Sequence, residues 1–201
     1  SFLGEWFHDT VDEMMKWIDH AISHARIRDA SITELEFPYE YRKGQKQMAA
    51  CVYKAIEGER RLFVQAPTGI GKTMAAMFPS VKAFATGLVS KIFYLTAKTI
   101  AGTVPDQALT LLREHGLKFS SVMLTAKEKI CLNETMECDA EHCPYAKGHF
   151  DRVNAALFEM ITQEERMDRE VIRSYAERYR VCPFELGLDA SLFADTIIGD
   201  Y

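Results

Sequence analysis

The stretch that decides the fold reads Ala66-Pro67-Thr68-Gly69-Ile70-Gly71-Lys72-Thr73. It has the form of a phosphate-binding loop, with alanine in place of the usual first glycine. Glycines let the backbone turn tightly, so that successive N–H groups point inward around phosphates, and a helix that starts at the loop adds its positive dipole end. In this chemistry Lys72 binds the β- and γ-phosphates of ATP and Thr73 offers its hydroxyl to Mg²⁺.

The residues around the loop predict a strand before it and a helix after it. Residues 61–65 (Arg-Leu-Phe-Val-Gln) predict a short buried strand, and residues 72–86 predict a helix that Gly87 ends. An accidental glycine-rich turn is the alternative, but this loop has the strand-to-helix setting that the mechanism requires. The sequence therefore predicts a nucleotide-binding site.

Further along, strands and helices alternate. Residues 91–95 predict a strand, 100–115 a helix, 121–124 a strand and 194–198 a returning strand. Such alternation predicts an α/β fold with a mostly parallel sheet and right-handed crossovers. Between about 127 and 185 the pattern shows helices at 153–163 and 169–179, no strand-like alternation, and four of the five cysteines, which predicts a small helical Cys-rich insertion.

The residues upstream of the loop predict two helices, at about 5–28 and 45–57, with a linker at 31–38. Cys51 lies on the apolar side of the second helix, which predicts a core position. Gln45 opens that helix, and its amide both donates and accepts, so it could read the edge of adenine. A solvated polar helix start is the alternative for Gln45.

The clustered cysteines are Cys131, Cys138, Cys143 and Cys182, and Pro183 follows the last. No two are separated by only two residues, as partners in structural zinc sites often are, so this spacing favours an iron–sulfur cluster over a single zinc ion. A zinc site that includes His142, and four buried unliganded thiols, are the alternatives. Net charge is −5, and no segment has the roughly 20 apolar residues that a membrane helix needs, so no membrane partner is expected.

With both motifs in hand, the chain resembles the XPD/DinG family of superfamily 2 DNA helicases. The resemblance covers residues 37–201 and is carried by the phosphate loop, by Tyr94-Leu95-Thr96-Ala97-Lys98-Thr99, by Cys131, Cys138 and Cys143, and by Cys182-Pro183-Phe184-Glu185. Arg42 and Gln45, with Met48, match the element that the family has ahead of the loop.

The resemblance implies a RecA-like motor domain that uses ATP and Mg²⁺ and carries a [4Fe–4S] cluster on the four cysteines. It implies movement from 5′ to 3′ on single-stranded or forked DNA. Arg42 and Gln45 would bind nucleotide with residues 66–73, and Thr96, Lys98 and Thr99 would grip DNA phosphates. Three basic residues flank the cysteines and are candidates to line the DNA path, with solvated surface charge as the alternative: Lys127, Lys129 and Arg152.

The implied organisation is an N-terminal helical extension (1–36), the first part of motor domain 1 (37–125), the iron–sulfur insertion (126–186) and a return strand (187–201). A monomer in the cytoplasm or at the nucleoid is expected. The chain departs from the family because it contains no Asp-Glu-Ala-His box, and Asp200 is not assigned as the catalytic acid. We therefore expect these 201 residues to hydrolyse little ATP. Two alternatives are a phosphate-loop ATPase with a zinc module that acts on RNA or protein, and a binding fragment without turnover.

Overall fold

The computed structural model describes residues 2–97 and 103–200, and a parallel sheet lies at its centre. Within these residues the strand order is β1 (Ile92–Thr96), β4 (Thr196–Asp200), β2 (Ser121–Met123) and β3 (Arg166–Met167). All neighbouring pairs are parallel. The expected α/β class with a parallel sheet is confirmed. Because the strands are parallel, the carboxyl ends of β1 and β4 lie at the same edge, where Thr96 is opposite Asp200.

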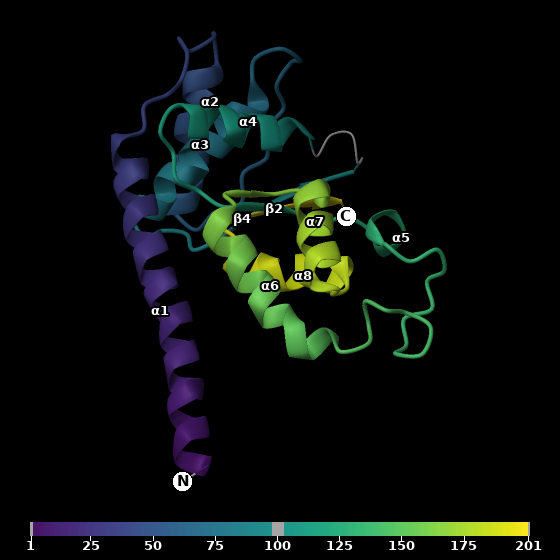
Figure 1. Cartoon of the computed structure of the whole chain (residues 1–201). Helices are drawn as coiled ribbons and strands as arrows, with labels where there is room; N and C mark the ends of the chain where they lie inside the picture. The colour runs from purple at the N-terminus through teal and green to yellow at the C-terminus, as the bar shows by residue number, and fades with distance from the viewer. Residues whose placement is uncertain (1, 98–102, 201) are drawn as a thin grey trace.

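Helices cover both faces of the sheet (Figure 1). One side carries α2 (Gln45–Glu57), α3 (Lys72–Ala85) and α4 (Thr103–Glu114), and the long α1 (Phe2–Glu34) runs beside the body. The other side carries α6 (His149–Gln163), α7 (Arg169–Tyr179) and α8 (Pro183–Phe193). The single turn α5 (Lys127–Ile130) starts the Cys-bearing loop. None of the described helices combines the length and the apolar character needed to cross a membrane.

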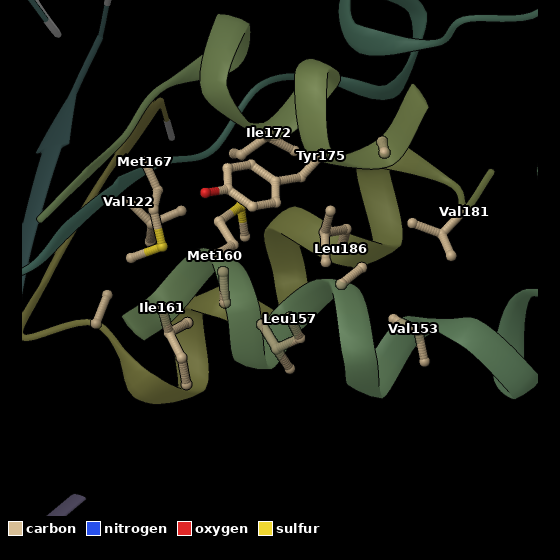
Figure 2. Packing of buried hydrophobic residues seen from close by; sticks show 14 of the residues in the cluster. Val122, Val153, Leu157, Met160, Ile161, Met167, Ile172, Tyr175, Val181 and Leu186 are labelled. Atoms are coloured by element: carbon tan, nitrogen blue, oxygen red, sulfur yellow. The ribbon is translucent and has the colours of Figure 1, made fainter. Parts of the chain in front are cut away.

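Two hydrophobic cores result, one on each face. Phe84 and Phe119 stack edge to face in the core between α1, α3, α4 and the sheet. Figure 2 shows the other core, where Met160 and Leu157 from α6 meet Tyr175 from α7 and Leu186 from α8. Val122 and Met167 reach this core from the strands, so the Cys-bearing region and the sheet share one buried cluster.

Several expected elements are present. The helices at 45–57 and 169–179 have the predicted bounds. Asp168 explains why α7 begins at Arg169, since its side chain accepts the backbone N–H groups of Glu170 and Val171. The strands β1, β2 and β4 match within two residues, and α6 begins four residues before the predicted 153. Residues 100–102 of the predicted helix 100–115 lie outside the described residues.

The predicted buried strand at 61–65 is wrong. These residues have no strand conformation, and Phe63 is 93% exposed. A strand forms only by pairing its backbone with a neighbour, and no described strand pairs with this segment. Residues 61–65 therefore have the composition of a strand but no neighbouring strand to pair with.

Two other expectations about the N-terminal part are wrong. Residues 31–34 continue α1 instead of forming a linker, because Ile32 is fully buried and Lys82 donates to the carbonyls of Ile32 and Thr33 at the helix end. Cys51 is exposed, not in the core. The buried positions of α2 are Gln45 and Ala49, so the packed face lies on another side of that helix.

Three elements were not predicted: α5, α8 and the two-residue strand β3. The strand β3 pairs with β2 through Ser121 and Arg166, so part of the 126–186 region belongs to the sheet. Two residues are too few to show an alternation of apolar and polar positions, so no pattern in the sequence predicted β3.

Candidate functional site: a phosphate loop and a cysteine-lined cavity

The loop at residues 66–73 has the backbone that its glycines predict. Gly69 and Gly71 take left-handed conformations, with φ of 86° and 79°, and Gly71 directly precedes α3, which begins at Lys72. The Lys72 ammonium bends back over the loop and donates to the carbonyl oxygens of Ala66 (3.1 Å) and Pro67 (2.9 Å). A helix N-terminus and one ammonium group therefore meet at this corner, which is the arrangement that binds phosphate.

Arg42 and Gln45 lie against the same loop. The Arg42 guanidinium donates to the carbonyl of Gly69, and the Gln45 amide donates to the carbonyl of Gly71 at 3.3 Å. The Gln45 side-chain oxygen accepts the backbone N–H of Arg42 at 3.1 Å, and the whole residue is buried. Both residues connect the chain ahead of α2 to the loop.

At the end of β1, Thr96 is buried and its hydroxyl lies 3.3 Å from a carboxylate oxygen of Asp200. This contact joins the ends of β1 and β4 at the sheet edge. Lys98 and Thr99, the other two residues of the expected DNA-gripping turn, lie outside the described residues.

The four clustered cysteines line one cavity of about 420 Å³. Cys143 is buried, Cys131 and Cys182 are half-buried, and Cys138 is exposed. Burial raises the pKa of the Cys182 thiol. Among the residues that the structure describes, no three His, Cys, Asp or Glu side chains lie close enough together to hold a metal ion.

His149 is a member of this site that the sequence analysis missed. It lines the cavity, it is 6% exposed, and its Nδ1 accepts the backbone N–H of Cys182 at 3.2 Å. Burial lowers the pKa of His149, which favours the neutral ring that can accept this bond. It stands six residues after Cys143, and that nearness was the signal available in the sequence.

The three basic candidates lie at different places around the cavity. Lys127 lines it, a hydrogen bond to Cys138 raises the pKa of its ammonium, and the same ammonium lies 5.4 Å from the centre of the Phe184 ring. Lys129 is exposed on α5. Arg152 donates to the carbonyls of Lys147, Tyr179 and Arg180, so its guanidinium holds the start of α6 to the end of α7.

Comparison with known proteins shows which family the chain belongs to. Residues 42–146 match the model of the DEAD/DEAH box helicase family, which is just over half of the chain. A probable ATP-dependent helicase of Methanocaldococcus jannaschii is 43% identical over 165 residues, which are 81% of this chain and 25% of the relative. The chain thus spans about a quarter of the length of that relative. The matched region begins at Arg42 and contains the whole phosphate loop, and the chain belongs to the DEAD/DEAH box helicase family.

Proposed function

We propose that this chain is the ATP-binding part of a DNA helicase motor, with residues 66–73 as its nucleotide site. The observation that carries the proposal is the Lys72 ammonium lying across a loop that ends in a helix N-terminus. When ATP and Mg²⁺ bind, Lys72 would exchange its two carbonyl contacts for β- and γ-phosphate oxygens, and Thr73 would offer its hydroxyl to the metal.

Gln45 is our candidate for binding the edge of adenine, and Arg42 is a further candidate for binding the nucleotide. Their contacts with the carbonyls of Gly69 and Gly71 support a place for both residues in the nucleotide site, because a change at either residue acts directly on the phosphate loop. The same contacts give Gln45 a second role, which is to position the loop.

The nucleotide site is tested by substituting Lys72→Ala and measuring the affinity of a fluorescent ATP analogue for the 201-residue chain. Loss of a charged hydrogen-bonding partner of phosphate is worth about 1.5 to 3 kcal/mol, or roughly 10- to 150-fold in affinity. Lys54→Ala is the control, because it removes a lysine from the last turn of α2, away from the loop. Equal affinities of the two variants would remove the basis of the proposal.

We propose further that the cysteine-lined cavity holds a [4Fe–4S] cluster on Cys131, Cys138, Cys143 and Cys182. Around one zinc ion at about 2.3 Å, four thiolate sulfurs stand less than about 4 Å apart. A cluster has eight atoms of its own between the thiolates, so its ligands stand further apart. The observation that supports the cluster is the single cavity lined by all four cysteines. Such a cluster would tie the start of α8 to the loop that follows α5.

The cluster is tested by measuring iron, zinc and acid-labile sulfide in protein purified without oxygen. We expect about four irons and four sulfides per chain, and loss of both in Cys143→Ser. Cys51→Ser is the matched control, because Cys51 is the cysteine outside the cavity and is exposed. One zinc per chain without sulfide would favour the alternative, a phosphate-loop ATPase with a zinc module that acts on RNA or protein.

For the whole protein we propose ATP-driven movement from 5′ to 3′ on single-stranded DNA. Thr96 at the sheet edge, with Lys98 and Thr99 that follow it in the sequence, would hold DNA phosphates. Lys127, Lys129 and Arg152 remain candidates near the cysteines. The whole protein should unwind a duplex with a 5′ single-stranded tail and leave one with a 3′ tail paired. The 201 residues alone should bind single-stranded DNA in an anisotropy assay with little ATP turnover, and strong DNA-stimulated turnover would contradict this.

A further inference from the structure

The N-terminal half of α1 carries an apolar stripe that nothing in the described structure covers. The stripe consists of six residues on one side of the helix: Leu3, Phe7, Val11, Met14, Ile18 and Ile22. Their spacing of four, four, three, four and four residues keeps them on one face. The exposed fractions are 74% for Leu3, 58% for Phe7, 52% for Met14, 40% for Ile18 and 64% for Ile22, and Val11 is half-buried. Contiguous exposed apolar surface of this kind marks an interaction site.

The contacts of α1 with the rest of the protein use a different side of the helix. Trp17 packs against Phe158 and Phe193, and His24 and Arg28 bind Asp195. At 3.6 residues per turn, these contact residues lie roughly a quarter turn away from the stripe. The start of α1 also extends beyond α6 and α8 (Figure 1), so the body does not reach it.

We propose that this stripe is an interface with a second copy of the chain, in which two α1 helices pack antiparallel about a two-fold axis between Val11 and Met14. The spacing of the stripe reads the same in both directions. In the antiparallel pair, Leu3 of each chain therefore faces Ile22 of the other, Phe7 faces Ile18, and Val11 faces Met14. A surface that matches itself in this way is what a two-fold symmetric interface requires.

The size of the stripe is consistent with a dimer of low affinity. Five of its side chains expose 40% to 74% of their surface, and a second helix would bury part of this, which is less than the about 800 Å² per partner of a standard interface. Met15 borders the stripe, is exposed, and adds to this surface. We therefore expect a weak dimer with a dissociation constant on the order of micromolar.

A second copy suits this helix better than a membrane surface. The other sides of the same half of α1 carry five acidic residues and one lysine: Glu5, Asp9, Asp12, Asp19 and Glu13, with Lys16. Helices that lie on membranes carry lysine and arginine beside their apolar face, since biological membranes are anionic. The charge of α1 opposes that mode of binding.

The first test is sedimentation equilibrium of the 201-residue chain from about 1 to 300 µM, a range that brackets micromolar association. We expect the mass to rise from monomer to dimer, and Met14→Glu to weaken association by at least about tenfold, because it buries an unpaired charge. Leu192→Glu on α8 adds the same charge at an exposed apolar residue outside the stripe and should leave the association unchanged. A monomer over the whole range, or equal association of wild type and Met14→Glu, would overturn the proposal.

The second test concerns the antiparallel arrangement. In a chain that carries both Leu3→Lys and Ile22→Glu, opposite charges face each other in an antiparallel dimer and like charges face each other in a parallel one. We expect this double variant to associate at least about tenfold more tightly than Leu3→Glu with Ile22→Glu. Equal association of the two double variants would exclude the antiparallel pair. Binding of the monomer to anionic vesicles, lost in Met14→Glu, would assign the stripe to a membrane instead.

Discussion

Gly71 stands where the phosphate loop, the start of α3 and the side chain of Gln45 meet. Its φ of 79° lies in the left-handed region, and a Cβ atom added there would overlap the Gln45 side-chain nitrogen. Two separate constraints therefore act on this residue, one from the backbone and one from a neighbour. The neighbour is itself bound to the loop, so a movement of Gln45 also moves the site.

The substitution Gly71→Ala should consequently weaken nucleotide binding as well as lower stability. Gly87→Ala is the matched control, since Gly87 has φ of 71° and nothing within 4 Å of an added Cβ. The left-handed backbone costs each alanine about 1 kcal/mol of stability. Only Gly71→Ala should also weaken binding of the ATP analogue, by roughly tenfold or more. A comparison of thermal melts with binding isotherms separates the two effects, and equal nucleotide affinities would show that the contact with Gln45 is unimportant.

At the scale of elements, a buried carboxylate attaches α1 to the sheet. Asp195 lies one residue before β4, is 3% exposed, and bonds to Arg28 (2.9 Å) and His24 (2.9 Å) of α1. It also accepts the backbone N–H and the hydroxyl of Ser120, one residue before β2, both at 2.8 Å. One side chain therefore joins three elements that are far apart in the sequence.

This arrangement predicts a pH-dependent stability. Burial alone would raise the pKa of Asp195, but the bonds and charges of His24, Arg28 and Ser120 outweigh burial and lower it. A carboxylate with a lowered pKa in the folded state stabilises the fold above its unfolded pKa of about 3.9, and this contribution is lost as pH falls through the folded pKa. Asp195→Asn should destabilise the protein by about 3 kcal/mol at pH 7, as expected when a buried ion pair loses a partner.

Urea unfolding at pH 7 and at pH 3 tests this prediction. The difference in the free energy of unfolding between wild type and Asp195→Asn should be smaller at pH 3. Asp29→Asn is the control, because Asp29 binds the same Arg28 but its side chain is 43% exposed, so its loss should cost less than about 1 kcal/mol. A pH-independent difference would mean that the charge of Asp195 does not hold α1.

At the scale of the whole molecule, two separate cores lie on the two faces of one sheet, and the segment that enters the phosphate loop belongs to neither. Phe119 is fully buried in the core beneath α3 and α4, whereas Phe63 is 93% exposed. Phe119→Ala should cost about 3 to 5 kcal/mol through lost burial and the cavity left behind. Phe63→Ala should change the free energy of unfolding by no more than about 0.5 kcal/mol. Chemical denaturation measures both, and a large loss for Phe63→Ala would place residues 61–65 inside the fold.

Local features of the sequence predicted part of this structure and site. The glycines and Lys72 predicted the backbone of the phosphate loop, because a tight left-handed turn before a helix depends on residues that are neighbours in the chain. For the same reason α7 begins where Asp168 can cap it, and α2 has the predicted bounds. Long apolar strands were also recognised, since β1 and β4 carry their own pattern.

Contacts between distant residues decided the rest. His149 joined the cysteine-lined cavity because the fold brings it to Cys182, 33 residues away. Residues 61–65 and Cys51 look buried by composition, yet burial needs a second surface, and the described fold places none against them. The sequence by itself determined the phosphate loop and the class of fold, whose causes lie within a few residues. The tertiary structure alone decided which apolar residues are covered and that the four cysteines share one cavity, because packing depends on partners that are remote in the chain.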